Sequence, residues 1–209
     1  MNKIPKHISY NLAGTLTQLN QFEHYNKLIE KMIASSNPNE FNKEGIDPLL
    51  RTNEYRHEII FPILHRKSMF ISVFSFIERE LLLIASLYEK SFSEFTPLVK
   101  TKNLGIDKAR TFFKENIRIS INKLDDWNKL KDYQSVRNFF VHNPYEAIRA
   151  DHKSFAAFQR LSSINLTKYD LDDNTSSYSI EITSQLCLDL LDLAHSFFND
   201  FYELLEKVK

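Results

Sequence analysis

The segment Asp132–Tyr145 holds the residue types whose spacing best supports chemistry. It reads Asp-Tyr-Gln-Ser-Val-Arg-Asn-Phe-Phe-Val-His-Asn-Pro-Tyr. On a helix, Asn138 and His142 lie four residues apart and face the same side, and the long side chain of Arg137 can reach toward them. Arginine binds phosphate oxygens through a fixed fork of donors, and histidine exchanges protons near neutral pH.

These residue types together suit the cleavage of an RNA phosphodiester without a metal ion. A base takes the proton of the 2′-hydroxyl, a guanidinium stabilises the pentacoordinate anion, and an acid protonates the leaving 5′ oxygen. We therefore predict that Arg137 and His142 are catalytic and that Asn138 positions the substrate or the imidazole. The predicted substrate contacts are Tyr145, Asn143, Tyr133 and Lys131. No metal and no cofactor is expected.

A structural interpretation of Arg137 and His142 remains open. Cations in the last turn of a helix stabilise its macrodipole whether or not they bind a ligand. An Arg–His pair at this spacing is also common by chance. With four to six intervening residues, roughly 0.9 such pairs are expected in this chain, and roughly 0.15 when Asn, Asp or His must follow the arginine. Spacing alone therefore does not decide between the two interpretations.

The Arg137-Asn138-x-x-x-His142 pattern, at the end of an amphipathic helix in a helical chain, resembles the signature of the HEPN superfamily. Two further segments are similar to the family. Phe70–Leu82 resembles its earlier core helix, and Tyr178–Thr183 followed by a long apolar helix resembles the end of many bacterial members. The resemblance covers about residues 60–207.

This resemblance implies a helical bundle that forms a homodimer, with the two motifs meeting across the dyad. In active members the paired Arg and His side chains form one metal-independent endoribonuclease site, so we expect 2′,3′-cyclic phosphate and 5′-OH ends. Such proteins act as toxins, in toxin–antitoxin pairs and in antiviral defence, which makes RNA and an antitoxin or other regulatory protein the expected partners. Many members are instead non-catalytic modules that dimerise or bind a nucleotide or a partner, and this alternative stays open.

The chain departs from the family at one position. Some toxin members carry a tyrosine two residues after the histidine, where a partner antitoxin attaches a nucleotide. Here Pro144 occupies that position and Tyr145 follows one residue later. The modification is therefore not carried over to this chain.

Composition favours helices and excludes several other kinds of site. The 209 residues include only 3 Gly and 6 Pro, fewer than a sheet-rich fold needs for its turns. The glycines stand far apart, so they cannot form a glycine-rich phosphate loop. The single cysteine, Cys187, excludes an intrachain disulfide and a cysteine zinc cluster, and it favours a reducing, cytoplasmic setting.

Charge is balanced overall, with 27 Lys+Arg and 27 Asp+Glu, but it is unevenly distributed. Residues 100–168 carry 14 basic and 7 acidic side chains, whereas residues 169–206 carry 9 acidic and no basic ones. This asymmetry predicts a basic surface for a polyanion, and solvated faces are the alternative. Glu78-Arg79-Glu80 interrupts the apolar run Met69–Tyr88, so we expect a core helix there and no membrane partner.

Apolar spacing predicts five helices. They span residues 16–35, about 48–90, 106–117, 126–143 and about 184–207. Residues 36–48 are expected to form a loop, and Pro62 is expected to kink or divide the second helix. The central core stripe is predicted to contain Phe70, Phe74, Ile77, Leu81, Ile84 and Tyr88. Phe112 and Phe113 are either core residues or rings that stack on RNA bases.

Two β-prone stretches flank turn residues before the last helix. Residues 164–169 and 178–182 predict one small hairpin, and Thr183 is expected to cap the helix that follows. The predicted fold class is therefore all-α, a HEPN-like helical bundle with one small β-hairpin before the C-terminal helix. We expect a single helical domain over 1–209, with an N-terminal helical extension over 1–45 and a HEPN-like core over 46–209.

Overall fold

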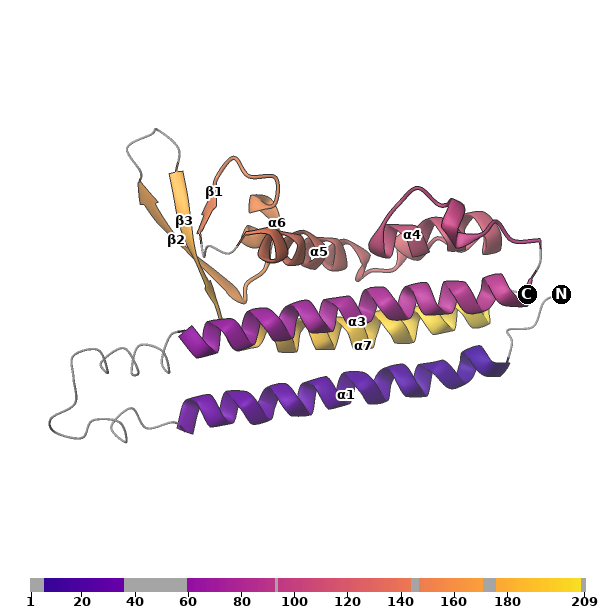
Figure 1. Cartoon of the computed structure of the whole chain (residues 1–209), viewed down its shortest axis with the longest axis horizontal. Coiled ribbons are helices and arrows are strands. Elements are labelled where there is room, and N and C mark those ends of the chain that lie inside the picture. The colour runs from indigo at the N-terminus through magenta and orange to yellow at the C-terminus, as the bar shows by residue number, and fades with distance from the viewer. Residues whose placement is uncertain (1–5, 36–59, 93, 144–146, 171–175, 208–209) are drawn as a thin grey trace, which may run out of the picture. The chain divides into compact units, whose positions relative to one another are not determined.

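The computed structural model describes residues 6–35, 60–92, 94–143, 147–170 and 176–207. Helices predominate and are accompanied by one small antiparallel sheet (Figure 1). The mostly helical fold class is thereby confirmed. The predicted loop 36–48 and the first part of the predicted helix 48–90 lie outside the described residues.

The chain divides into two compact units, each assembled from separate stretches. The first unit contains residues 1–21, 73–134 and 190–209, and the second unit contains residues 22–72 and 135–189. Four long helices contribute residues to both units: α1 (Lys6–Ser35), α3 (Phe61–Ser91), α5 (Trp127–His142) and α7 (Gln185–Glu206). The predicted boundary at residue 45 lies outside the described residues.

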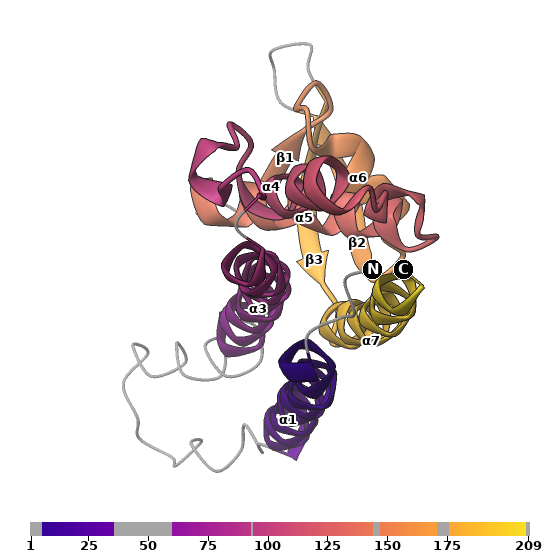
Figure 2. The ribbon, with the colours of Figure 1, turned by 90° about the vertical axis from the view of Figure 1, so that its right-hand side faces the viewer.

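The first unit contains four shorter elements besides its parts of the long helices. They are η4 (Leu98–Lys100), α4 (Gly105–Phe112), the π-helical turn η5 (Phe113–Ile117) and η6 (Ile121–Lys123). Within this unit, α1 runs opposite to α3 and α7, and α4 and α5 lie on one side of those three helices (Figure 1, Figure 2). The predicted helix 106–117 is confirmed, with a change to π geometry at Phe113.

The predicted core stripe of α3 is confirmed. Each of its six side chains is at most 4% exposed, because residues three and four apart project from the same side of a helix. The inner face of α5 is buried as well, at Trp127, Leu130, Val136 and Phe140. Pro62 lies in the first turn of α3, where a missing amide donor costs no helical hydrogen bond, so the described helix contains no break there.

Aromatic rings fill the core of the first unit. The ring of Phe113 lies 5.0 Å from that of Phe201, and Trp127 lies 6.4 Å from Phe197. Phe112 and Phe113 are both fully buried. The core interpretation of these two phenylalanines is therefore confirmed, and stacking on RNA bases was the wrong alternative.

The second unit contains the sheet, which has one strand more than predicted. The predicted hairpin is present as β2 (Ile164–Asp170) and β3 (Ser176–Ile182). A short strand, β1 (Ala147–Arg149), pairs with the other side of β3, so the order is β1-β3-β2. The short helix α6 (Phe155–Arg160) was not predicted either.

Thr183 does not cap α7 with its side chain. Its hydroxyl donates to the carbonyl of Ser163 at 2.8 Å, which ties the end of β3 to the residue before β2. The helix begins at Gln185, close to the predicted start. The predicted cap was wrong, because the hydroxyl donates to Ser163, whereas a cap would accept a hydrogen bond from a helix amide.

Candidate functional site

Buried aromatic rings fix the C-terminal half of α5, which belongs to the second unit. Phe140 meets Phe70 edge-on at 6.0 Å and Phe158 at 5.6 Å. Phe139 lies 5.1 Å from Phe158. Because Phe139 and Phe140 are at most 7% exposed, the opposite side of the helix is the side available to a ligand or partner.

That opposite side carries the predicted catalytic residues. Asn138, Val141 and His142 are exposed, and Arg137 is half-buried at the margin. At 100° per residue these four positions span one strip of the helix surface, with Val141 between Arg137 and Asn138. We call Arg137, Asn138, Val141 and His142 the motif strip.

A hydrogen bond orients the arginine within the motif strip. Arg137 Nη1 donates to Asn138 Oδ1 at 3.0 Å. Asn138 lies only about 40° around the helix from His142, so this bond turns the guanidinium toward the histidine side. This geometry agrees with the prediction that the Arg137 side chain reaches toward Asn138 and His142.

His142 is the last residue of α5 and is exposed. Within the part of the chain that the structure describes, its imidazole has no hydrogen-bond or ion-pair partner. A helix end on the protein surface leaves room for a ligand at this ring. One chain therefore offers one accessible imidazole at the motif strip, whereas phosphodiester cleavage needs both a base and an acid.

Asn143 closes the helix that carries the motif. Its backbone amide and its side-chain Nδ2 both donate to the carbonyl of Phe139, at 2.8 and 3.0 Å. The predicted end of the helix before Pro144 is confirmed, since the residue before a proline avoids helical angles. The Asn143 side chain is thus a second donor to the Phe139 carbonyl, and the predicted contact Tyr145 lies outside the described residues.

Tyr133 and Lys131 belong to the first unit, whereas the motif strip belongs to the second. Tyr133 is fully buried, so the prediction that it contacts the substrate is wrong: its ring is a core residue. Lys131 Nζ donates to Asp107 Oδ2 and to Gln134 Oε1. This lysine is a half-buried partner of α4, and its predicted contact with RNA would compete with that ion pair.

Lys67 is a cation that sequence reasoning missed. Its Nζ lies 5.4 Å from the ring centroid of Phe140, which brings an ammonium from α3 to the helix of the motif. The sequence carried a weak signal, two adjacent basic residues at the start of the core helix, Arg66 and Lys67. Periodicity alone does not show which helix such a cation meets.

Arg66 has a structural role. It binds Glu30 through two nitrogens at 2.8 and 2.9 Å and donates to the carbonyl of Ile182 at 3.1 Å. The hydrogen bonds to Glu30 raise the pKa of Arg66. Cys187 donates its thiol to the carbonyl of Arg66 at 3.5 Å, and burial raises its pKa to about 12, so it is no candidate nucleophile.

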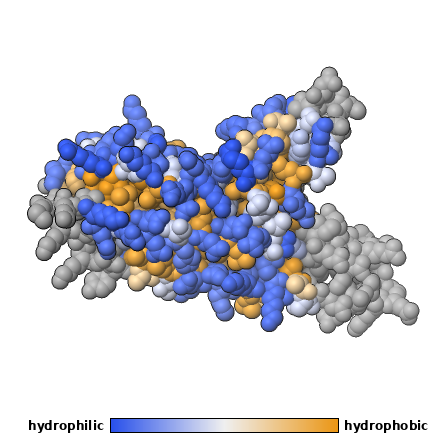
Figure 3. Space-filling view, turned by 180° about the vertical axis from the view of Figure 1, so that it is seen from behind, coloured by the Kyte–Doolittle hydropathy of each residue, from blue (hydrophilic) through white to orange (hydrophobic). Residues whose placement is uncertain are grey.

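Apolar side chains also reach the surface on α1 of the second unit. Tyr25, Leu28 and Met32 are 52%, 49% and 58% exposed, and their spacing places them on one side of the helix. Val141 in the motif strip is 47% exposed. Figure 3 shows one face of the molecule, where apolar patches interrupt a charged and polar surface.

The described residues contain no cluster of three or more His, Cys, Asp or Glu side chains able to hold a metal ion. None of the described helices is both long and apolar enough to cross a bilayer. Comparison of the chain with protein-family models, curated proteins and solved structures finds no match.

Proposed function

We propose that the protein is a metal-independent endoribonuclease of the HEPN type, acting as a homodimer. The observation that carries this proposal is the motif strip: an arginine, an asparagine and an accessible histidine on one side of a rigid helix end. The Arg137–Asn138 hydrogen bond supports it, because it orients a phosphate-binding group before any ligand arrives.

The dimer answers the need for two proton-transfer groups. One His142 takes the proton from the ribose 2′-hydroxyl, and the 2′ oxygen attacks the neighbouring phosphorus. The second His142, from the other copy, donates a proton to the 5′ oxygen as its bond to phosphorus breaks. The products are a 2′,3′-cyclic phosphate and a 5′-hydroxyl, so water and metal are not needed for this step.

Arg137 would act on the charge that develops between these two proton transfers. Its guanidinium binds the non-bridging oxygens, which carry more negative charge in the transition state than in the substrate. Exposed Val141 would pack against its counterpart on the other copy and shield the site from water. A cytoplasmic toxin or defence enzyme, held in check by an antitoxin or other regulatory protein, is the setting that we propose.

The second candidate is a non-catalytic HEPN-like module that dimerises or binds a nucleotide or partner protein. The exposure of Val141 favours it, because an apolar side chain among polar ones also suits an interface. Arg137 would then be an interface residue held by Asn138. Only the first candidate predicts that the protein cleaves RNA.

The test is an RNA cleavage assay in EDTA with analysis of the product ends. The parent protein is compared with Arg137→Ala and His142→Ala. Matched controls replace an exposed arginine and an exposed histidine of the same unit, Arg149→Ala and His24→Ala. We expect each motif variant to lose at least about 100-fold in cleavage rate, the usual range for a lost proton-transfer or charge-stabilising group.

The controls should cleave like the parent, and all five proteins should form dimers of the same mass by light scattering. Parent cleavage that leaves 3′-phosphate and no cyclic product would contradict the proposed proton transfers. No cleavage by a well-folded parent dimer would favour the binding module instead.

A further inference from the structure

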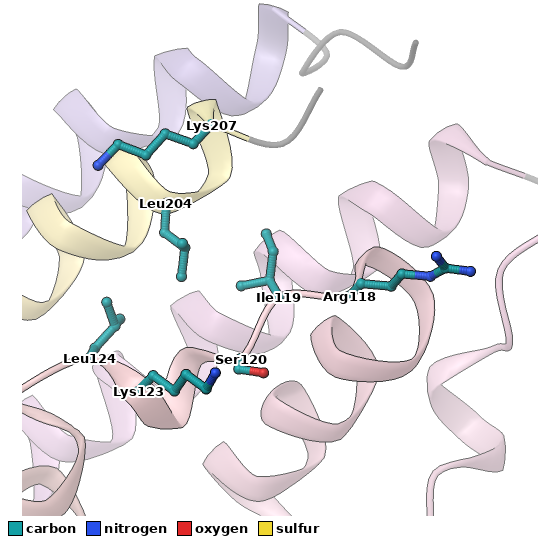
Figure 4. Close-up of a pocket in the computed structure, with 7 residues that line it drawn as sticks. All are labelled: Arg118, Ile119, Ser120, Lys123, Leu124, Leu204 and Lys207. Atoms are coloured by element: carbon teal, nitrogen blue, oxygen red, sulfur yellow. The ribbon is translucent and has the colours of Figure 1, made fainter.

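The first unit contains a surface cavity that the proposed ribonuclease chemistry does not use. Its volume is about 390 Å³, and it lies between residues 118–124 and the C-terminal end of α7. Figure 4 shows Ile119, Leu124 and Leu204 pointing toward one another across it. This volume lies within the range of small-molecule sites and is of the order that one nucleotide needs.

The floor of the cavity is apolar. Ile119 is 3% exposed, and Leu124 and Leu204 are half-buried. Leu204 lies near the end of α7 and lines this cavity. Branched aliphatic side chains with accessible surface favour a ligand that carries an apolar group, because burial of that group removes apolar surface from water.

The rim of the cavity is positively charged. Arg118, Lys123 and Lys207 line it, and no described acidic side chain does. Lys207 has only an exposed ion pair with Glu203 at 3.7 Å. Within the described chain, the side chains of Arg118 and Lys123 make no ion pair, so both cations are available to an anion.

A hydroxyl and an amine both line the cavity, at Ser120 and Lys123. Figure 4 shows the Lys123 amine directed toward Ser120, whose side chain also lines the cavity. The Ser120 hydroxyl makes no capping hydrogen bond to η6. An ammonium beside a hydroxyl donor suits the oxygens of a phosphate group.

The backbone conformation of Arg118 is a second, independent observation that favours an anion-binding role for this side chain. Its φ of 62° places it in the left-handed region, at the end of η5. Glycine is the usual residue at such a helix end, and an arginine there is strained. The turn sends Ile119 to the floor and the Arg118 side chain away to the edge (Figure 4). What the position gains over glycine is therefore the guanidinium.

The geometry points to a binding site for a 5′-nucleotide, with its phosphate at Lys123 and Ser120 and its base on the apolar floor. Arg118 and Lys207 add positive potential at the rim. The apolar floor carries no polar side chain that could read a base edge, so AMP and GMP should bind alike. This site does not depend on the proposed ribonuclease function, because none of its residues belongs to the motif strip.

Calorimetric titration of the full chain with AMP tests the proposal, with inorganic phosphate and octanoate as comparison probes. We expect AMP to bind at least tenfold more tightly than either probe, and GMP to bind within threefold of AMP. Lys123→Ala should weaken AMP binding at least tenfold. The matched control, Lys129→Ala, replaces an exposed lysine of α5 that does not line the cavity and should change nothing.

The Arg118→Gly variant distinguishes a loss of AMP binding from a loss of folding. Glycine accepts the left-handed backbone, so the melting temperature should stay or rise while AMP binding weakens about threefold. Three results would overturn the proposal: no AMP binding, equal binding of inorganic phosphate, or tighter binding of octanoate.

Two sources of the nucleotide can be separated in the His142→Ala background, where RNA stays intact. Tighter binding of a 5′-phosphorylated RNA than of AMP assigns the site to an RNA end. Equal or weaker binding of that RNA assigns it to a free nucleotide. A chain that cleaves no RNA but binds AMP through Lys123 would retain this inference while losing the ribonuclease proposal.

Discussion

Asn138 is placed to position Arg137 rather than to transfer a proton. Its Oδ1 accepts from the guanidinium at 3.0 Å and leaves the imidazole of His142 untouched. Asn138→Ala should therefore lower kcat/KM for RNA about tenfold, the cost of one hydrogen bond to a charged group, and less than Arg137→Ala does. The matched control on the same helix is Asn128→Ala, another exposed asparagine. A loss as large as that of His142→Ala would give Asn138 a direct role in the chemistry.

His65 makes the stability of the protein depend on pH. Burial lowers its pKa, and attraction by Glu30 opposes the shift less strongly. The unfolded chain therefore binds a proton at the ordinary pKa of about 6.5, whereas the folded chain binds it at a lower pH. Below that pH the unfolded state holds more protons, so the free energy of unfolding falls as the pH falls.

His65→Phe, which cannot titrate, should lose less stability between pH 7.5 and pH 5 than the parent does. Urea unfolding at the two pH values measures this difference. His24→Gln, at an exposed histidine of α1, is the control and should follow the parent. A parent that is equally stable at both pH values would contradict the direction of the shift.

At the level of elements, two glycines should respond to alanine in opposite directions. Gly105 begins α4 with φ of 58°, and an added Cβ would lie 3.3 Å from Gln134 Nε2 and from the carboxyl group of Glu78. Gly105→Ala should lower the free energy of unfolding by about 1–2 kcal/mol. Gly14 lies inside α1 with open space around it, so Gly14→Ala should raise it by about 1 kcal/mol. Chemical unfolding of both variants checks the signs, and equal signs would contradict the backbone geometry.

Periodic apolar positions made the long helices predictable. Phe70, Phe74 and Ile77 follow the 3.6-residue repeat, and burial of that repeat is a local property of the sequence. The same repeat, extended from Leu130, would have placed Tyr133 in the core. The stacking ability of its ring favours a substrate contact, but the helical position outweighs it.

Contacts between distant segments were not predictable. Strand β1 has only three residues, too few to show alternation, and it exists because Ile148 pairs with Tyr178 of β3. The cavity of the first unit requires Leu204 to meet residues 118–124. The motif strip could be predicted because all its members lie within one helix.

For the whole molecule, the proposed dimer must use one apolar surface rather than another. Val141 and Leu28 are almost equally exposed, at 47% and 49%, but only Val141 lies in the motif strip. Val141→Glu should therefore convert the dimer to monomers and abolish RNA cleavage, because it buries two like charges at the dyad. Leu28→Glu on α1 should leave both unchanged. Light scattering and the cleavage assay measure the two effects, and dimer loss in Leu28→Glu alone would move the interface to α1.

Subunit mixing tests the composite site most directly. Parent protein is exchanged with increasing amounts of His142→Ala at constant total concentration, and RNA cleavage is measured in EDTA. If each site needs a His142 from both copies, the activity follows the square of the parent fraction. Activity that falls in direct proportion to the parent fraction would show that each chain acts alone, and no activity in the parent would contradict the ribonuclease function itself.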